Sequence, residues 1–196
     1  MQQPLVFATG NPNKVREIQQ IMGDAYQFLS LKDIGCTEEI PETTGTIKGN
    51  ALQKAQYVYD KYGYNCFSED TGLLVDALDG APGVDTAFFG GPQKDHNANI
   101  NRLLKELEGE KNRQAHFKTV IAIIINGQAQ TFEGVVYGQI LEARQGEGGF
   151  GYDPVFQPEG YDRSFAQMGA EEKGAISHRG RATVKLQEFL RRMEGL

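Results

Sequence analysis

The apolar run from Phe117 to Ile125, which ends at the pair Asn126-Gly127, limits the possible folds more than any other part of the sequence. A run of this length that is rich in β-branched residues predicts a long strand. An Asn-Gly pair directly after it indicates a two-residue hairpin turn, so Gln130 to Leu141 is expected to return as the antiparallel partner. A turn this short cannot connect parallel strands. Any fold of this chain therefore has to contain an antiparallel pair.

The N-terminal third of the chain alternates between short apolar runs and helical patterns. Leu5 to Ala8 is apolar and ends in a turn, and apolar residues then recur at helical spacing as far as Met22. The following elements are expected to be a strand near Tyr26 to Leu31, a helix from Asn50 to Tyr62 and a strand from Asn65 to Phe67. Units of strand and helix beside an antiparallel pair imply a mixed sheet.

The second half of the chain adds further helices. Apolar residues from Ile100 to Leu107 form a helical stripe, Pro154 to Phe156 predicts a short strand, and a helix capped by Ser177 continues to Met193. No internal repeat or linker divides the 196 residues. We therefore expect an α/β fold in one elongated domain over residues 1–196, with a mixed β-sheet, flanking helices and a ligand in the crevice at the strand ends.

Charge and composition narrow the classes of function. The formal net charge of -6 argues against a general affinity for nucleic acid, whose phosphates attract basic surfaces, but leaves room for a small anionic ligand in a local basic pocket. The first residues lack the basic and apolar regions of a signal peptide, and no apolar run reaches the length of a membrane span. We expect a cytoplasmic protein without membrane contact, in which Cys36 and Cys66 stay reduced.

The turn after the first strand has the composition of a phosphate-binding loop. A glycine there lets backbone N–H groups approach a ligand, the free N–H groups of a helix start attract anions, and a lysine adds a positive charge. An ordinary tight turn with a surface lysine would have the same composition. The residues concerned are Thr9, Gly10, Asn11, Pro12, Asn13 and Lys14.

Two adjacent carboxylates, Glu69 and Asp70, follow the strand expected at Asn65 to Phe67. Neighbouring residues of a strand point to opposite faces, so at least one of the two is expected to face the ligand crevice. Mg²⁺ commonly combines one or two carboxylates with the phosphates of a substrate. Glu42, in the preceding polar loop, could complete such a site. The alternative is a solvated acidic turn, with Glu42 as an ordinary surface residue.

An aromatic run with an acid could bind a nucleobase. Aromatic rings stack on bases, and a carboxylate accepts hydrogen bonds from a base edge. An aromatic plug of the protein core would show the same pattern, so both interpretations stay open. The run consists of Phe150, Gly151, Tyr152 and Asp153.

Cationic residues gather around the start of the last helix. They are Lys173, His178 and Arg179, and Arg181 follows shortly after them. The helix dipole disfavours positive charge at this end of a helix. We therefore expect an anion or a base carbonyl between these residues, and a solvated cationic face is the alternative.

The chain resembles the non-canonical purine nucleoside triphosphate pyrophosphatases, the inosine triphosphatase family, in five ordered motifs. These are TGNPNK, SEDTGL, GAPGV, GFGYDPVF and EEKGAISHRGRA. The resemblance spans nearly the whole chain. It implies two lobes around a central cleft, a homodimer, and a Mg²⁺-dependent reaction. That reaction hydrolyses ITP, dITP or XTP to the monophosphate and pyrophosphate, which keeps deaminated purines out of the nucleotide pool.

The resemblance also implies roles for single residues. Asp70 is expected to be the proton acceptor that activates water and to contact the metal, together with Glu42 and Glu69. Thr71 is expected to touch the substrate. The loop from Thr9 to Lys14 would bind the triphosphate, and the other substrate contacts would come from Phe150, Gly151, Tyr152, Asp153, Lys173, His178 and Arg179.

The chain departs from the family pattern at two positions. Many members carry an arginine within a Ser-Ala-Arg-Tyr run after the GAPG loop, whereas this chain has Phe88 at that place. Gly49 stands where a glutamate often precedes the helix asparagine. We therefore assign no phosphate or dimer contact to Phe88 and no metal ligand at Gly49.

Two other functions fit parts of the pattern. One is a house-cleaning pyrophosphatase for other modified nucleotides, which differs only in the base it accepts. The other is a nucleotide-binding sensor without turnover. Adjacent carboxylates argue against a sensor, because negative charge beside a triphosphate is costly unless a metal or a reaction requires it.

Overall fold

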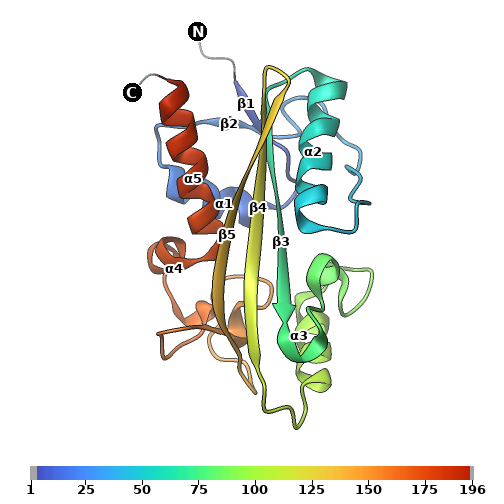
Figure 1. The fold of residues 1–196 in the computed structure, drawn as a ribbon, viewed down its shortest axis with the longest axis vertical. Helices are drawn as coiled ribbons and strands as arrows, with labels where there is room; N and C mark the ends of the chain where they lie inside the picture. Colours follow the sequence, from blue (N-terminus) through green and yellow to red (C-terminus); the bar gives the residue numbers. More distant parts are fainter. Residues whose placement is uncertain (1–3, 195–196) are drawn as a thin grey trace. The chain divides into compact units, whose positions relative to one another are not determined.

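The structure is a computed structural model, and it describes residues 4–194. Six strands form one sheet in the order β2-β1-β3-β4-β5-β6 (Figure 1). The strands are β1 (Leu5–Phe7), β2 (Phe28–Leu29), β3 (Cys66–Val75), β4 (Gln114–Ile125), β5 (Gln128–Ile140) and β6 (Phe156–Pro158). The α-helices are α1 (Pro12–Met22), α2 (Ile47–Tyr62), α3 (His96–Glu106), α4 (Ala170–Ile176) and α5 (His178–Met193).

The sheet is mixed, as predicted. β1 pairs in parallel with both β2 and β3, with Val6 opposite Cys66, whereas β5 pairs with β6 in the antiparallel direction. The predicted hairpin joins β4 to β5 through Asn126 and Gly127, whose φ values of 51° and 80° suit a two-residue turn. The expected α/β class with a mixed sheet and flanking helices is therefore confirmed.

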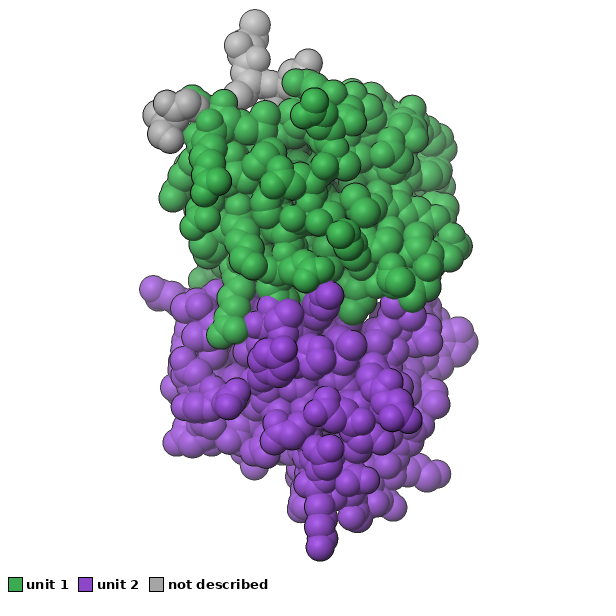
Figure 2. All heavy atoms as spheres, in the orientation of Figure 1, with its two compact units in different colours: residues 1–70, 119–134, 179–196 green, residues 71–118, 135–178 purple. Residues whose placement is uncertain are grey.

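The chain divides into two compact units, which Figure 2 colours separately. Unit 1 contains residues 1–70, 119–134 and 179–196, and unit 2 contains residues 71–118 and 135–178. The chain passes from one unit to the other within β3, β4 and β5, and again between the first two residues of α5. The predicted central cleft and the assignment of one domain with two lobes stay predictions.

Unit 1 has helices on both faces of its strands (Figure 1). On one face α1 and α5 bury Ile18 and Leu186 in a core with Phe7 and Phe67, whose rings stack 4.4 Å apart. On the other face α2 packs on β3, and the Cys66 thiol donates a hydrogen bond to a backbone carbonyl of α2 at 3.1 Å. The two faces of β3 therefore pack against different helices.

Unit 2 has a core of its own in which aromatic rings dominate. Phe117 of β4 lies 4.7 Å from the Phe156 ring and 6.3 Å from the Phe165 ring. α3 contributes Ile100 and Leu103 to the same cluster. The stripe predicted from Ile100 to Leu107 is thus the buried face of this helix, which begins earlier, at His96, because Asp95 caps it through the Ala98 N–H at 2.7 Å.

The structure corrects three expected boundaries. β3 does not end at Phe67 but continues to Val75, so Glu69 and Asp70 lie inside a strand. The segment predicted as a strand from Pro154 begins with a 3₁₀ turn, and pairing starts only at Phe156. α2 begins at Ile47 and not at Asn50, because the Thr46 side chain accepts a hydrogen bond from the Gly49 N–H.

Candidate active site

The acidic pair splits across the two faces of β3. Ser68 donates to the Ala51 carbonyl of α2, and Asp70, two residues further on, lies on that same face. Phe67 packs with the α1 and α5 core, and Glu69 points to the same side. The alternation of a strand therefore gives two neighbours in the chain separate surroundings.

Lys54 organises the α2 face. Its Nζ lies 2.5 Å from Glu42 Oε1 and 3.8 Å from Asp70 Oδ1, and it donates a hydrogen bond to the Glu69 carbonyl at 2.8 Å. The side chain is 9% exposed. A buried ammonium that touches two carboxylates from different segments brings the polar loop of Glu42 against β3.

Asp70 has the properties of a base that works near neutral pH. Burial raises the pKa of its carboxyl to about 6, although Lys54 and Lys14 act in the opposite direction. The nearby Glu42 and Glu69 carboxylates raise it further. A carboxyl that titrates close to the working pH is suited to accept and release protons.

Glu69 lies in a row of alternating charges on the other face. Lys14 Nζ is 2.5 Å from Glu69 Oε1, Arg179 Nε is 3.2 Å from Glu69 Oε2, and an amino group of Arg179 is 2.5 Å from Glu17 Oε2. Glu69 is fully buried, and Arg179 is 2% exposed. The structure therefore surrounds the Glu69 carboxylate with the chain's own cations.

The pKa values in this row follow from burial and from the opposite charges. Burial acts to raise the pKa of the Glu69 carboxyl, but Arg179 and Lys14 outweigh it and hold that pKa well below its usual value. Burial lowers the pKa of Lys14, and Glu69 opposes that shift. Burial acts to lower the pKa of Arg179, but Glu69 and Glu17 raise it overall. Glu69 is therefore a permanent negative charge, unlike Asp70.

The predicted phosphate-binding loop is a capped helix start. The Asn11 side chain accepts a hydrogen bond from the Asn13 N–H at 3.0 Å, and Thr9 accepts one from the Asn11 N–H at 3.1 Å. Pro12 is the first residue of α1. A Cβ added at Gly10 would meet nothing within 4 Å, so the backbone there is open to an approaching group. Lys14, in the first turn, connects this loop to Glu69.

A second cluster, the aromatic–lysine cluster, lies in unit 2 and consists of Phe150, Asp153, Phe165 and Lys173. Lys173 Nζ lies 2.6 Å from Asp153 Oδ2, and both side chains are almost fully buried. The ammonium also lies 4.9 Å from the centre of the Phe150 ring and 5.5 Å from that of Phe165. The Phe150 N–H donates to Asp153 Oδ2 at 3.0 Å, so the carboxylate fixes both the lysine and the loop.

Gly149 lets this loop close on the aspartate. Its φ is 69°, in the left-handed region, and a Cβ at this position would lie 2.0 Å from Asp153 Oδ2. The next glycine, Gly151, donates its N–H to His96 Nδ1 at 3.2 Å. His96 thus supports the loop from α3.

Two predicted base contacts take part in the core of unit 2. Tyr152 is buried, and its hydroxyl donates to the Thr86 carbonyl at 2.6 Å. Burial raises the pKa of Tyr152 well above its usual value. The His178 ring stacks on Phe117 with the ring centres 4.5 Å apart. Within the aromatic run, the core-plug interpretation therefore holds for Tyr152, and ligand contact by the other residues of the run stays a prediction.

The predicted site residues are divided between the two units. The group in unit 1 contains Thr9, Gly10, Asn11, Pro12, Asn13, Lys14, Glu42, Glu69, Asp70 and Arg179. The group in unit 2 contains Thr71, Phe150, Gly151, Tyr152, Asp153, Lys173 and His178. Arg179, predicted as a substrate contact, has two protein carboxylates as partners, and its contact with substrate stays a prediction.

Sequence reasoning missed Lys54, Glu17 and His96. Lys54 had a usable signal, because it lies on the buried face of α2 together with Ala51, Ala55 and Val58, where a lysine is out of place without a carboxylate partner. Glu17 had none, since it looks like any charged residue of an amphipathic helix. His96 had none either, since an exposed histidine at the start of a helix looks like an ordinary surface residue.

Glu42 and Asp70 bring to the α2 face two carboxylates, the kind of ligand that a divalent cation binds. Glu42 Oε1 and Asp70 Oδ1 contact the same ammonium, so the two oxygens are no further apart than the sum of those two contacts. Within residues 4–194, no group of three or more His, Cys, Asp and Glu side chains could hold a metal ion. Mg²⁺ often needs only one or two carboxylates when phosphates supply other ligands.

The whole chain is similar to known proteins. The family model described as the Ham1 family matches residues 5–189. A protein of Flavobacterium psychrophilum named dITP/XTP pyrophosphatase is 52% identical over 187 residues, covering 95% of this chain and 98% of its own length. A dITP/XTP pyrophosphatase of Caldanaerobacter subterraneus is 45% identical over 97% of this chain and 98% of the relative.

Solved structures agree with these matches. The Ham1 protein of Staphylococcus aureus is 34% identical with a TM-score of 0.88, covering 96% of this chain and 98% of that one. A HAM1 protein of Coxiella burnetii is 32% identical with a TM-score of 0.90, covering 97% of this chain and 100% of that one. The resemblance found in the five sequence motifs is confirmed, and this chain belongs to the Ham1 family.

Proposed function

We propose that this protein hydrolyses the non-canonical purine nucleoside triphosphates dITP, XTP and ITP to the monophosphate and pyrophosphate. The observation that carries the proposal is the acidic pair of β3, in which Asp70 has a pKa of about 6 and lies beside buried lysines. The names of the relatives, which are dITP/XTP pyrophosphatases, support the same reaction. The protein would thus remove deaminated purines from the nucleotide pool.

The triphosphate would bind at the loop from Thr9 to Asn13 and at two lysines. The positive end of the α1 dipole attracts phosphate oxygens. Lys14 and Lys54 each lie beside a carboxylate and can share their charge with an incoming anion. The open backbone at Gly10 supports close approach by a phosphate.

Asp70 would act as the proton acceptor. Above pH 6 its carboxyl is mostly ionised and can take a proton from the attacking water. The positive charge of Lys54, at 3.8 Å, favours the ionised form of the carboxyl. Because phosphoryl transfer depends mainly on positioning and on charge, a fixed base beside two cations supplies what the chain itself can contribute.

We further propose Mg²⁺ as the cofactor, held by Glu42 and Asp70. When bound, such an ion would offset the negative charge of the phosphates and lower the pKa of water. Glu69 was predicted as a third ligand. Since two cations already hold its carboxylate on the opposite face of β3, we assign it to the placement of Lys14 instead.

The base would be read by the aromatic–lysine cluster of unit 2. Hypoxanthine and xanthine carry a carbonyl at the six-position, where adenine carries an amino group. The Lys173 ammonium is a hydrogen-bond donor and pairs with the carbonyl. With adenine it would face the amino group, which is also a donor, and would form no hydrogen bond with it. Phe150 offers a ring face, and His178 and Thr71 are further proposed contacts.

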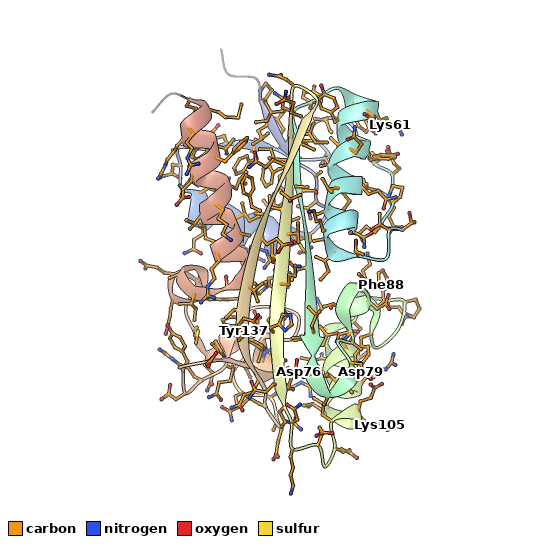
Figure 3. All side chains as sticks on the ribbon, in the orientation of Figure 1. Lys61, Asp76, Asp79, Phe88, Lys105 and Tyr137 are labelled. Atoms are coloured by element: carbon orange, nitrogen blue, oxygen red, sulfur yellow. The ribbon has the colours of Figure 1, made fainter. Side chains whose placement is uncertain are left out.

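We also propose that the protein forms a homodimer and that it is located in the cytoplasm. Phe88, which stands where relatives were expected to have an arginine, is 41% exposed, and the Lys94 ammonium lies 4.9 Å from its ring centre (Figure 3). None of the helices formed by residues 4–194 has the length and apolar character needed to cross a lipid bilayer. The number of subunits can be measured by light scattering.

The test is pyrophosphate release from a panel of purified triphosphates with Mg²⁺ or with EDTA. We expect rapid release from dITP, XTP and ITP, slow release from dATP, and none with EDTA. Preference for a modified pyrimidine triphosphate would replace the proposal by the house-cleaning alternative. Nucleotide binding without any release would support the sensor.

A further inference from the structure

Arg179 occupies an unusual place for a cation. It lies in the first turn of α5, where the helix dipole disfavours positive charge, and its side chain is only 2% exposed. Two carboxylates from other elements compensate it, Glu69 from β3 and Glu17 from α1. Arg179 therefore joins three elements of unit 1 through one guanidinium.

We propose that Glu17 is a positioning residue for phosphate binding, because it anchors Arg179, which fixes Glu69, which in turn orients Lys14. The proposal rests on the proposed role of Lys14 as a phosphate contact. Glu17 itself touches no substrate in this scheme. It lies one turn after Lys14 on α1, so the same helix supplies both ends of the row.

The geometry of the guanidinium carries the first step. One side of it, through Nε and an amino group, lies 3.2 and 3.5 Å from the two Glu69 oxygens. The other amino group lies 2.5 Å from Glu17. A planar guanidinium has donors in fixed directions, so two carboxylates on different sides determine its orientation.

Charge balance carries the second step. Lys14 and Arg179 bring two positive charges and Glu69 only one negative charge, so Glu17 balances the row. Without Glu17, the guanidinium is free to turn and take both Glu69 oxygens in a closer bidentate pair, the strongest arrangement for these groups. Lys14 would then lose its contact at 2.5 Å and with it a defined position beside the loop.

Glu17 is also a residue that can be replaced. Its side chain is 21% exposed, so a shorter residue leaves no sealed cavity and water can reach the gap. Glu17→Gln keeps an oxygen that accepts from Arg179, whereas Glu17→Ala removes it. Glu17→Gln therefore removes the negative charge and keeps the anchoring contact, whereas Glu17→Ala removes both.

The experiment measures the binding of inorganic tripolyphosphate by calorimetry, in the absence of Mg²⁺ and of any base. The proteins are wild type, Glu17→Ala, Glu17→Gln, Lys14→Ala and the double variant Glu17→Ala with Lys14→Ala. We expect Glu17→Ala to bind about fivefold more weakly, and Glu17→Gln to lie between this variant and wild type, because it keeps the contact with Arg179 but not the charge. In the Lys14→Ala background, loss of Glu17 should have no further effect, because Glu17 acts through Lys14.

A matched control is Glu38→Ala. Glu38 is a half-buried carboxylate that accepts hydrogen bonds from Tyr57, Tyr62 and Lys61, the last of which Figure 3 labels on α2. Its loss should lower the melting temperature and leave tripolyphosphate affinity unchanged. Steady-state kinetics should add a raised KM with an unchanged kcat for Glu17→Ala alone, a split that mere destabilisation does not produce.

Two results would overturn the inference while leaving the proposed function in place. One is wild-type affinity in Glu17→Ala although Lys14→Ala binds weakly. The other is an equal loss from Glu17→Ala with and without Lys14. If Lys14→Ala binds as well as wild type, the proposed phosphate role of Lys14 fails and the inference with it. If Glu17→Ala does not fold, Glu17→Ser, which cannot reach Arg179 either, takes its place.

Discussion

Asp70 and Glu69 are neighbours in the chain and yet differ in every property that matters for chemistry. Asp70 contacts Lys54 at 3.8 Å and titrates near pH 6, whereas Glu69 is enclosed by Lys14 and Arg179 and stays ionised. A base must change its protonation state, and a counter-ion must not. The structure therefore supports a division in which Asp70 reacts and Glu69 holds a lysine in place.

Replacing Asp70 by asparagine should stop turnover and leave the fold intact. The amide has nearly the same shape but cannot accept a proton or supply a carboxylate ligand to a cation. We expect pyrophosphate release from dITP to fall by at least about 100-fold, the contribution typical of a general base. Circular dichroism should show the same helix content as wild type. Near-normal hydrolysis would remove Asp70 from the reaction.

The pair of Lys173 and Asp153 allows stability and base recognition to be separated. Lys173→Met leaves the Asp153 carboxylate buried without its ion-pair partner at 2.6 Å, which should cost about 3 kcal/mol of unfolding free energy. Adding Asp153→Asn should restore most of that stability, because no charge is then left buried.

The same double variant should remain poor at using ITP, because the ammonium is still missing. Urea unfolding and kcat/KM for ITP, measured on the single and the double variants, test the two effects. Recovery of kcat/KM together with stability would show that Lys173 serves only the fold.

A single site residue could be predicted from the sequence only where its side chain is unusual for its position, such as a charged residue among apolar ones. Lys54 lies on the buried face of α2, and that contradiction could have been noticed in the sequence. The two partners of Arg179 could not have been found, because Glu17 lies 162 positions and Glu69 lies 110 positions away from it in the sequence. The motif residues themselves were predicted through the family resemblance, and their individual roles remain to be tested.

Helix and strand boundaries were predicted correctly where neighbouring residues alone determine the backbone conformation. The hairpin at Asn126 and Gly127 needs left-handed backbone, which these two residues accept, and it was predicted at the correct place. The end of β3 was wrong, because Glu69 and Asp70 interrupt the apolar pattern. Only their partners on neighbouring helices make it possible for charged residues to lie inside a strand.

Gly127→Ala should destabilise the hairpin. The φ of 80° places this residue in the left-handed region, where a Cβ costs about 1 kcal/mol. Thermal and urea unfolding should show a loss of that size. Gly169→Ala is a suitable control, because Gly169 has a φ of -68° and a Cβ there would meet nothing within 4 Å. An equal loss in both variants would contradict the explanation from backbone conformation.

At the scale of the whole molecule, the order of patterns along the chain was enough to predict a mixed sheet. The division into two units was not visible in the same way, since each unit is assembled from separate stretches of sequence. No linker or change of composition marks the points where the chain passes from one unit to the other. Such a division depends on packing between distant segments, which a single sequence does not display.

The stability of the metal-free protein should depend on pH through Asp70. Its folded pKa, about 6, is above the ordinary value of 3.8, so the folded state binds the proton more tightly than the unfolded state does. This favours folding below about pH 4 and is lost as the pH rises through 6. Above that, the ionised carboxyl costs up to about 3 kcal/mol.

Asp70→Asn should therefore be more stable than wild type at pH 8 in EDTA, and the difference should shrink between pH 6 and pH 4. Urea unfolding across this range is the measurement. A constant difference at every pH would mean that Asp70 does not titrate near 6.

Because the acidic pair is split between the two faces of β3, the odd-numbered residue Glu69 faces α1 and α5, whereas the even-numbered residue Asp70 faces α2. Sliding the strand by a single residue would exchange the surroundings of Glu69 and Asp70, and the reactive group would face α1 and α5 while the counter-ion faced α2. An insertion of one residue ahead of β3 that shifts the strand would preserve the sheet but remove Asp70 from the face on which it contacts Lys54. The length of the segment from Gly63 to Asn65, between α2 and β3, therefore determines which face of β3 carries Glu69 and which carries Asp70.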